Sequence, residues 1–242
     1  MIRVDNLRKN FGEVVAVDGV SFEVPDGQVT GLLGPNGAGK TTTLRMLYGL
    51  MRADGGRMEV DGVDVDKAPQ GAQAHMGILP DSRGLYPRLT AREHLRYFGR
   101  LQGVDKSVLE TRIDELVQQL EMGTIVDRRS EGFSQGERVK VALGRALVHN
   151  PANVLLDEPT NGLDVMGTRA MRGIIRRMRE EGKCVLFSSH IMQEVSALCD
   201  RIVIISAGHI VAQGTPAELL LQSGHDTLED AFVKLTGIDE VN

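Results

Sequence analysis

The sequence lacks several features that define common classes of protein. It contains no tryptophan, aromatic residues make up only 4% of its 242 residues, and there are only two cysteines. The scarcity of aromatic side chains argues against a surface on which nucleic-acid bases stack. Cys184 and Cys199 form no C-x-x-C pair, so we expect buried free thiols rather than a disulfide or a metal site.

The chain also lacks an excess of positive charge and any long apolar run. Its formal net charge is −5 and its pI is about 5.7, whereas a domain that binds nucleic acid is usually basic. No apolar stretch approaches the roughly 20 residues that span a bilayer. The segment from Met1 to Asp5 does not have the apolar core of a signal peptide. We therefore expect a cytoplasmic protein in which any membrane role comes through a partner.

Strand and helix patterns alternate over most of the chain. The first 34 residues read as strands, with alternating residues at 14–24 and a continuous apolar run at 29–34. Such alternation of strands and helices predicts an α/β protein with a largely parallel sheet and a binding site at the carboxyl ends of its strands. The further predicted strands are 56–62, 76–80, 153–157, 183–189, 201–206 and 209–214, and the further helices are 41–50, 165–181, 192–199 and one from Pro216.

A segment from Thr90 to His149 interrupts this alternation with helix signals alone. Thr90 and Glu93 fit a capping box that opens a helix. Apolar residues at helical spacing follow at 109–120 and 139–147. We expect one domain over residues 1–242, with residues 1–82 and 150–242 as an α/β core and residues from about 83 to 149 as a helical subdomain.

A glycine-rich loop after the strand at 29–34 carries the strongest chemical signal. It matches the pattern GxxxxGK[ST], in which backbone N–H groups and a helix N-terminus wrap phosphate groups. Lys40 would reach the β- and γ-phosphates, and the hydroxyl of Thr41 would reach Mg²⁺. The alternative, a merely flexible turn, is disfavoured by the strand before the loop and the helix after it. The predicted nucleotide-binding residues here are Gly34, Pro35, Asn36, Gly37, Ala38, Gly39, Lys40, Thr41 and Thr42.

Two acids end the apolar strand at 153–157. Asp157 could hold Mg²⁺ through water, and Glu158 could polarise an attacking water. Acids at strand ends are also common turn caps, so the phosphate loop upstream strengthens the catalytic interpretation. His190 follows a later strand, where a histidine is more often a structural hydrogen-bonding group. That structural interpretation also holds for His75, His94, His149, His209 and His225.

Four motifs together resemble those of the ATP-binding-cassette (ABC) ATPases. The phosphate loop, "FSQGE" at 133–137, "VLLDEPTNGLD" at 154–164 and "SSH" at 188–190 occur in the order of that family, and the resemblance covers nearly the whole chain. It implies a P-loop NTPase fold of the ABC type, with a mixed or parallel sheet core, an N-terminal antiparallel β region and an inserted helical subdomain. In that family two cassettes sandwich two ATPs between the phosphate loop of one copy and the signature loop of the other.

The resemblance assigns further roles position by position. Glu158 would be the general base, His190 the γ-phosphate sensor and Asp164 part of an inter-subunit loop. Phe11 would stack on adenine, where the family usually has a tyrosine. Asp81 departs from the family pattern, because a glutamine that senses Mg²⁺ and the membrane partner usually stands there. The predicted metal ligands are Thr41, Asp81 and Asp157.

The signature loop is the second departure. Ser134, Gln135, Gly136 and Glu137 resemble the family's signature with its serine and second glycine retained, and they also fit an S-x-x-E capping box. Both interpretations are compatible, because a helix N-terminus is itself an anion site. We expect Glu137 to face its own backbone, while Ser134 and Gly136 face the γ-phosphate held by another copy. Gln135 has no assigned role.

The segments 79–103 and 227–237 are similar to the exporter branch of the family, which includes sodium-efflux ATP-binding subunits. The resemblance therefore implies an ATP-hydrolysing subunit of an exporter, with ATP and Mg²⁺ as cofactors. Its implied partners are a second copy or a paralogous cassette, and integral membrane permease subunits that hold it at the inner face of the cell membrane, with no nucleic acid.

Two other functions use the same phosphate loop. A soluble ABC ATPase that acts on nucleic acid or ribosomes is disfavoured by the single cassette and the negative net charge. A GTPase or small-molecule kinase is disfavoured because the chain has no NKxD-type motif that reads the base. The transported substrate does not follow from the sequence, because substrate contacts would lie in the membrane subunits.

Overall fold

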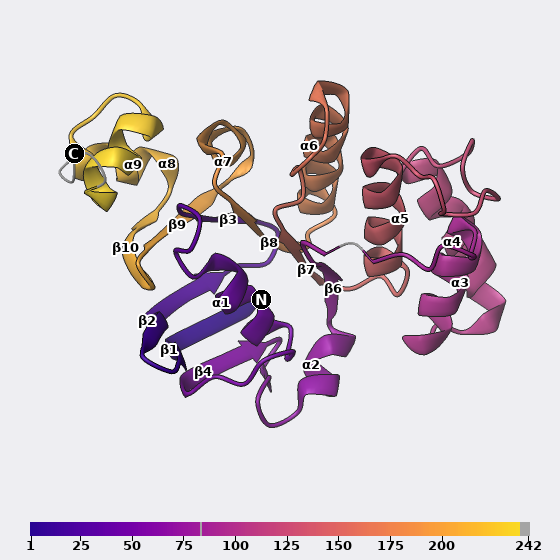
Figure 1. Ribbon diagram of the computed structural model, residues 1–242, viewed down its shortest axis with the longest axis horizontal. Coiled ribbons are helices and arrows are strands. Elements are labelled where there is room, and N and C mark those ends of the chain that lie inside the picture. The colour runs from indigo at the N-terminus through magenta and orange to yellow at the C-terminus, as the bar shows by residue number, and fades with distance from the viewer. Residues whose placement is uncertain (83, 238–242) are drawn as a thin grey trace.

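The structure, a computed structural model, describes residues 1–82 and 84–237. Arg83 and residues 238–242 belong to the predicted domain but lie outside the described residues. The strands form two sheets, one of six strands and one of four, and helices lie on both sides of the larger sheet (Figure 1). The predicted α/β class and the antiparallel N-terminal region are confirmed.

The six-stranded sheet holds the core of the molecule. Its order is β10-β9-β3-β8-β7-β6, and every neighbouring pair is parallel except β10 with β9. Every residue of β3, β7 and β8 is buried, which explains their largely apolar sequences. The strands are β3 (Val29–Leu33), β6 (Met76–Leu79), β7 (Asn153–Asp157), β8 (Cys184–Ser189), β9 (Arg201–Ser206) and β10 (His209–Gly214).

The smaller sheet is antiparallel in its described pairings and has the order β2-β1-β4-β5. Its buried side chains join one face of the larger sheet in a single hydrophobic cluster, in which Val4 and Phe22 lie with Leu155 and Leu186. The strands are β1 (Ile2–Phe11), β2 (Val14–Val24), β4 (Gly55–Val60) and β5 (Val63–Asp64).

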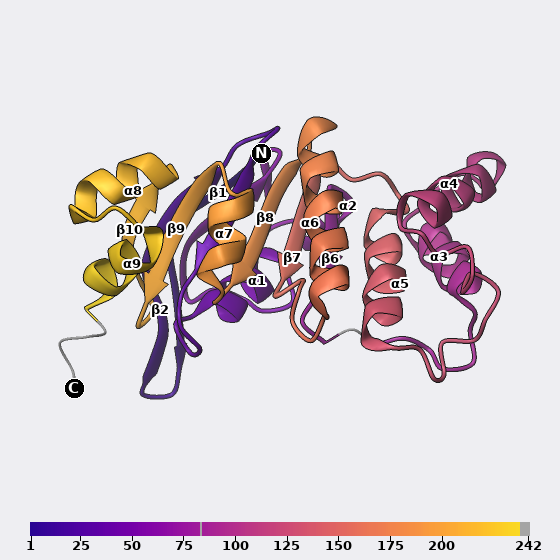
Figure 2. The same ribbon diagram turned by 90° about the horizontal axis from the view of Figure 1, so that it is seen from above.

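Helices cover the larger sheet on both faces (Figure 2). On one face, α1 packs with the smaller sheet through Leu44 and Leu47. On the opposite face, α6 and α7 bury Ile175 and Val195 in the second cluster. The helices outside the segment 91–147 are α1 (Lys40–Leu47), α2 (Pro69–Ala74), α6 (Val165–Glu180), α7 (Met192–Leu198), α8 (Pro216–Ser223) and α9 (Leu228–Thr236).

Three helices lie between β6 and β7 in the sequence, and in space they extend to one side of the sheets (Figure 1). They are α3 (Ala91–Leu101), α4 (Lys106–Gln119) and α5 (Gln135–Leu147). Both hydrogen bonds of the predicted capping box at Thr90 and Glu93 are present. The described part of this segment has one isolated bridge, between Thr90 and Arg129, and no strand. The predicted boundaries of the subdomain remain a prediction.

The sequence patterns missed α2 and α9 and extended α1 too far. The helix predicted at 41–50 ends at Leu47, because Gly49 adopts a φ of 68° that a continuing helix does not permit. Cys184 and Cys199 are buried free thiols, as predicted, and burial raises the pKa of the Cys184 thiol to about 12.

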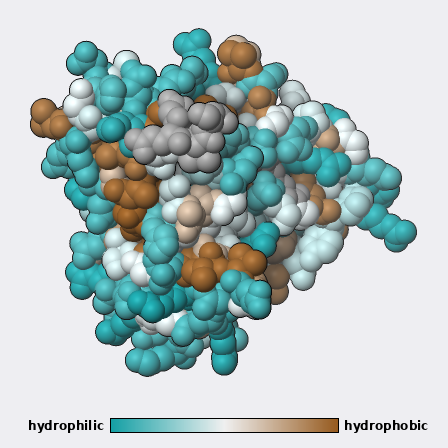
Figure 3. All heavy atoms as spheres, turned by 60° about the vertical axis from the view of Figure 1, so that its left-hand side comes forward, coloured by the Kyte–Doolittle hydropathy of each residue, from teal (hydrophilic) through white to brown (hydrophobic). Residues whose placement is uncertain are grey.

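Figure 3 views the side of the molecule that bears the C-terminal helices. The described residues on this side form a mostly hydrophilic surface with separate hydrophobic patches. Leu221 of α8, with 84% of its surface exposed, is among the exposed apolar side chains of the molecule. Within the described residues, none of the helices combines the length and the apolar composition needed to cross a bilayer.

Candidate nucleotide-binding and catalytic site

A cavity of about 470 Å³ lies where the loops after β3, β6, β7 and β8 meet. These are the carboxyl ends of parallel strands, where the sequence predicts the site. The cavity brings together most of the phosphate loop with three side chains that are distant in sequence, those of Asp81, Glu158 and His190. The remaining lining residues are Ala16, Asn36, Gly37, Ala38, Gly39, Lys40, Thr41, Thr42 and Asn161.

Two glycines allow the phosphate loop to pass close to neighbouring backbone. A Cβ on Gly34 would lie 2.3 Å from the carbonyl oxygen of Ile205, and Gly39 has a φ of 104°, which L side chains rarely adopt. Gly39 is the N-cap of α1 and no side chain caps this helix end. The first N–H groups of α1 therefore remain for an anion, which is the arrangement that binds phosphate.

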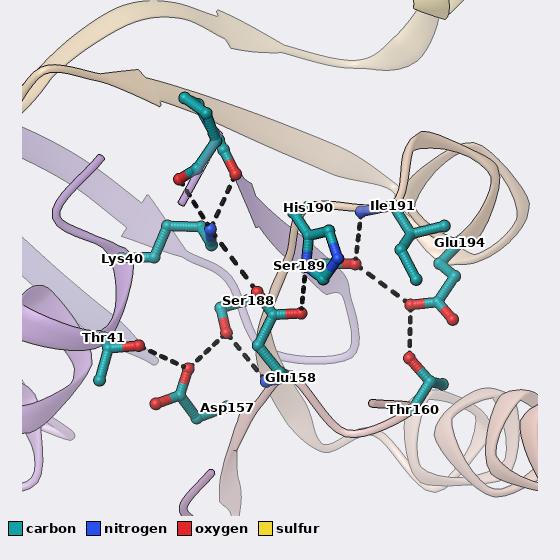
Figure 4. Close-up of polar contacts among 12 residues, drawn as sticks. Lys40, Thr41, Asp157, Glu158, Thr160, Ser188, Ser189, His190, Ile191 and Glu194 are labelled. Atoms are coloured by element: carbon teal, nitrogen blue, oxygen red, sulfur yellow. Dashed lines mark hydrogen bonds and ion pairs between the residues drawn. The ribbon is translucent and has the colours of Figure 1, made fainter. Parts of the chain in front are cut away.

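Lys40 lies at the floor of the cavity, with its ammonium group largely buried. Its Nζ donates to the carbonyl oxygens of Gly34, at 2.7 Å, and Pro35, at 3.1 Å, and lies 3.5 Å from Oε1 of Glu158 (Figure 4). A buried ammonium beside backbone N–H groups creates a strongly positive wall for phosphate oxygens.

Asp157 carries the buried carboxylate of the site. It accepts hydrogen bonds from Oγ of Ser188 at 2.6 Å and from Oγ1 of Thr41 at 3.3 Å. Burial raises the pKa of Asp157, and the nearby negative charges of Asp81 and Glu158 raise it further, while the two hydrogen bonds lower it. A divalent cation here would neutralise this concentration of negative charge.

The residues fit Mg²⁺ delivered with a nucleotide. Thr41, Asp81 and Asp157 offer hydroxyl and carboxylate oxygens, which are the hard ligands that Mg²⁺ prefers. The described residues contain no cluster of three or more His, Cys, Asp or Glu side chains that would hold a metal ion unaided. A nucleotide bound in the cavity would supply phosphate oxygens as further ligands.

Glu158 and His190 are in contact at the cavity. Nδ1 of His190 lies 3.0 Å from Oε2 of Glu158 (Figure 4), because Glu158 follows β7 and His190 follows the neighbouring strand β8. Glu158 has a φ of 48°, a left-handed conformation that costs a non-glycine residue about 1–3 kcal/mol. Its N–H donates to Oγ of Ser188 at 3.0 Å, so Ser188 holds both acids at the end of β7. Strain of this kind is typical of residues whose geometry serves a reaction.

The signature loop lies outside this cavity. Ser134 and Glu137 form both bonds of the predicted capping box: the N–H of Ser134 donates to Oε2 of Glu137 at 2.7 Å, and the N–H of Glu137 donates to Oγ of Ser134 at 3.2 Å. Arg128 donates to the other oxygen of Glu137, and the Ser134 N–H lowers the pKa of Glu137. The prediction that Glu137 faces its own backbone is confirmed.

Two other predicted site residues, Phe11 and Asp164, do not line the cavity. Phe11 ends β1 with 47% of its surface exposed, and Nζ of Lys9 lies 5.6 Å from the centre of its ring. Ala16, on the strand paired with β1, does line the cavity. Asp164 caps α6 by accepting the N–H of Gly167 at 2.7 Å. Adenine stacking by Phe11 and the inter-subunit role of Asp164 remain predictions.

Several residues of the site were not assigned a role from the sequence. Asn161 lines the cavity, and Ser188 bridges Asp157 to Glu158. Ser188 stands in the motif "SSH", but that motif identifies only the histidine. A buried side-chain bridge between two strands leaves no periodic signal, so only the sheet register reveals it.

A phosphate loop that opens a helix, a buried acid at the end of a parallel strand of the same sheet and a glutamate facing a histidine define a P-loop nucleotide hydrolase. Residues 17–161 match the protein family described as "ABC transporter", and the chain belongs to this family. It is an ABC ATPase and the ATP-binding subunit of an ABC transporter.

Two relatives with assigned names match over nearly all of this chain. The ABC transporter ATP-binding protein NatA of Bacillus subtilis is 42% identical over 238 residues, which cover 96% of this chain and 97% of the relative. The Nod factor export ATP-binding protein I of Paraburkholderia xenovorans is 37% identical over 229 residues, covering 94% of this chain and 75% of the relative.

Solved structures confirm the fold. The structure of the ATP-binding subunit of an ABC transporter superposes with a TM-score of 0.90 at 28% identity, covering 98% of this chain and 99% of that chain. The dimeric structure of the bacterial ABC transporter cassette MJ0796 has a TM-score of 0.81 at 24% identity and covers 89% of this chain and 98% of its own. This second likeness bears on the fold of this chain alone, and the dimer is a property of MJ0796.

Proposed function

We propose that two copies of this cassette, or one copy and a paralogue, close around ATP and drive export through separate membrane subunits. ATP binding closes the pair, and hydrolysis reopens it. The proposal places the protein in the cytoplasm, at the inner face of the membrane and bound to its permease. The transported substrate is set by the permease.

One observation carries the proposal of a pair. The cavity contains the phosphate loop, Glu158 and His190, but none of residues 134–137 lines it. Ser134 and Gln135 are exposed at the N-terminus of α5, a helix end whose dipole favours an anion. A second copy would supply this helix end to the phosphates bound in the first, so each site would be incomplete in one copy.

The chemistry follows from the side chains of the cavity. Glu158 would accept a proton from the attacking water, and His190, 3.0 Å from it, would orient that carboxylate and contact the γ-phosphate. Lys40 would exchange its two carbonyl acceptors for phosphate oxygens. This is a short movement, because its ammonium group already lies at the floor of the cavity. Mg²⁺ held by Thr41 and Asp157 would neutralise charge on the leaving phosphate oxygens.

A second cleft supports docking of a membrane subunit. It has a volume of about 300 Å³ and lies between the end of β6, α3 and α5, with Ile78, Phe98 and Ala146 among its lining residues. Leu50 lines it with 70% of its surface exposed, and Leu101 is another exposed apolar residue at the end of α3. Exposed apolar side chains around a cleft mark interaction surfaces. We propose that an apolar segment of the permease binds here.

Helix α5 would couple this cleft to the signature loop. Its N-terminus carries Ser134, and Arg145 near its C-terminus lines the cleft. Arg145 also donates to the carbonyl oxygen of Gly84 at 3.0 Å, close in sequence to Asp81. A 13-residue helix moves as a rigid rod about 20 Å long. Displacement at the cleft would therefore move Ser134 toward or away from the nucleotide.

Export is proposed on the similarity to relatives named for it. One similar protein is a Nod factor export ATP-binding protein. The similarity of residues 79–103 and 227–237 to sodium-efflux ATP-binding subunits also favours export as the direction of transport. A soluble ABC ATPase acting on nucleic acid is the alternative, and the net charge of −5 disfavours it.

The enzymatic part of the proposal is tested with the purified protein. We expect Mg²⁺-dependent ATP hydrolysis that Glu158→Gln reduces by about 100-fold or more while ATP still binds. Unchanged hydrolysis in Glu158→Gln would refute the assigned base. The transport part is tested by isolating the membrane protein that co-purifies and assaying ATP-driven uptake into inverted vesicles. Co-purification of RNA that survives moderate salt would instead favour the soluble alternative.

A further inference from the structure

Glu194 carries a buried carboxylate that the proposed mechanism does not use. It lies in the first turn of α7 with 2% of its surface exposed. No lysine, arginine or histidine of the described residues forms an ion pair with it. A buried acid without a cationic partner is rare and needs hydrogen-bond donors to compensate for lost water.

Two hydroxyl groups supply those donors (Figure 4). Oγ1 of Thr160 donates to Oε2 of Glu194 at 2.7 Å, and Oγ of Ser189 donates to the same oxygen at 3.1 Å. Ser189 is fully buried and Thr160 is 5% exposed. One carboxylate oxygen therefore joins two loops that are about 30 positions apart in the sequence.

Each loop carries one of the two facing side chains of the cavity. Thr160 is two residues after Glu158, and Ser189 immediately precedes His190. Oγ of Ser189 also accepts a hydrogen bond from the N–H of Ile191 at 3.0 Å, so this hydroxyl holds the residues on both sides of His190. The distance between Glu158 and His190 thus depends on a bridge that passes through Glu194.

We propose that Glu194 is a positioning residue that fixes Glu158 against His190 for ATP hydrolysis. This inference rests on the roles proposed above for those two residues. The strained backbone of Glu158 would relax if the loop were released, because a left-handed glutamate persists only where its surroundings hold it. A displacement of about 1 Å at a reacting group costs on the order of 100-fold in rate.

The test compares substitutions that keep and remove the hydrogen-bond acceptor. Glu194→Gln retains an oxygen for both hydroxyls, whereas Glu194→Leu retains none. We expect Glu194→Leu to lower kcat for ATP hydrolysis by about 10- to 100-fold with KM for ATP changed less than about threefold, because the phosphate loop is untouched. Glu194→Gln should keep kcat within about threefold of its value in the unsubstituted protein.

Two further variants keep the test decisive if Glu194→Leu does not fold. Thr160→Val is isosteric and removes one donor, while Thr160→Ser keeps it. We expect kcat to fall in Thr160→Val and to be retained in Thr160→Ser. Ser189→Ala removes the other donor and should also lower kcat.

Glu218 offers a matched control. It also lies in the first turn of a short helix, α8, where it bonds the N-cap Thr215. Glu218→Ala should lower thermal stability without changing kcat. If Glu194→Leu and Thr160→Val lower stability in the same way and leave kcat unchanged, Glu194 is only a structural residue of α7 and the inference is wrong.

The roles of Glu158 and His190 are measured in parallel. If Glu158→Gln and His190→Ala abolish hydrolysis while both bridge variants retain it, the inference fails and the proposed mechanism stands. If Glu158→Gln and His190→Ala leave hydrolysis intact, the proposed mechanism itself is wrong.

Discussion

Ser188 joins the two acids at the end of β7, and its replacement by alanine should destabilise the whole protein. Its hydroxyl donates to Asp157 at 2.6 Å and accepts the N–H of Glu158 at 3.0 Å, and the side chain is fully buried. Ser188→Ala therefore leaves a buried carboxylate with one donor fewer and a backbone N–H without this acceptor. A buried polar group that loses its partner costs about 1–3 kcal/mol.

The two losses are neighbours and do not add fully, so we expect about 3 kcal/mol of lost stability. For a protein of this size each kcal/mol lowers Tm by about 2–4 °C, so the expected shift is about 6–12 °C. The assay is thermal unfolding followed by circular dichroism, with urea unfolding as a second measure of the free energy.

Thr30→Val provides the matched control for Ser188→Ala. Thr30 lies on β3, next to β8, is fully buried, and its hydroxyl has no hydrogen-bond partner in the described structure. Removing that hydroxyl should leave Tm unchanged or raise it. A Tm for Ser188→Ala within about 1 °C of the unsubstituted protein would refute the bridging role of Ser188.

Three further predictions concern the phosphate site and the signature loop. Ser134→Arg should reduce ATP hydrolysis to background, whereas Glu137→Gln should retain most of it because an amide oxygen still accepts the Ser134 N–H; steady-state ATPase assays compare the two. Lys40→Ala should weaken ATP binding by about 100-fold, as measured with a fluorescent nucleotide, because it removes a charge-assisted contact to the phosphates. Asp157→Asn should abolish Mg²⁺-dependent hydrolysis yet stabilise the fold at neutral pH. The pKa of Asp157 is higher in the folded protein than its value of 3.8 in the unfolded chain. Below pH 3.8 the carboxyl is neutral in both states and costs no stability. As pH rises through the folded pKa, the buried carboxyl becomes charged and the free energy of unfolding falls. Urea unfolding at about pH 4 and about pH 7 should show the advantage of Asp157→Asn growing with pH.

The sequence predicts the phosphate loop, the acids at the end of β7 and the histidine after β8, because each stands at the end of a strand that is largely apolar. A continuous apolar run requires burial on both faces, and parallel packing then brings the ends of these strands to one edge. The capping box at Ser134 is predictable for a different reason, since its two bonds involve residues only three positions apart.

The contacts that hold the site together are not predictable in this way. Ser188 and Glu194 act across strands and loops that are far apart in sequence, so their roles depend on sheet register and on the packing of α7. Their residue types give no periodic signal. Helix α2 was missed because six residues with a glycine at their centre carry a weak helical pattern. The exposed position of Phe11 likewise depends on the β1–β2 hairpin, which local patterns do not orient.

In the proposed mechanism a second copy completes each site, and mixing two inactive variants tests this arrangement. Lys40→Ala and Ser134→Arg copies, each inactive alone, are mixed under conditions in which a tagged pull-down shows that mixed dimers form. A mixed dimer would contain one site with both defects and one site with neither. We expect hydrolysis to recover. Random pairing of equal amounts makes half of the dimers mixed, and one of the two sites in each mixed dimer is intact, so the rate should reach about a quarter of the unsubstituted rate if the sites act independently. No recovery in demonstrably mixed dimers would contradict this arrangement, because both defects would then lie within the site of a single chain.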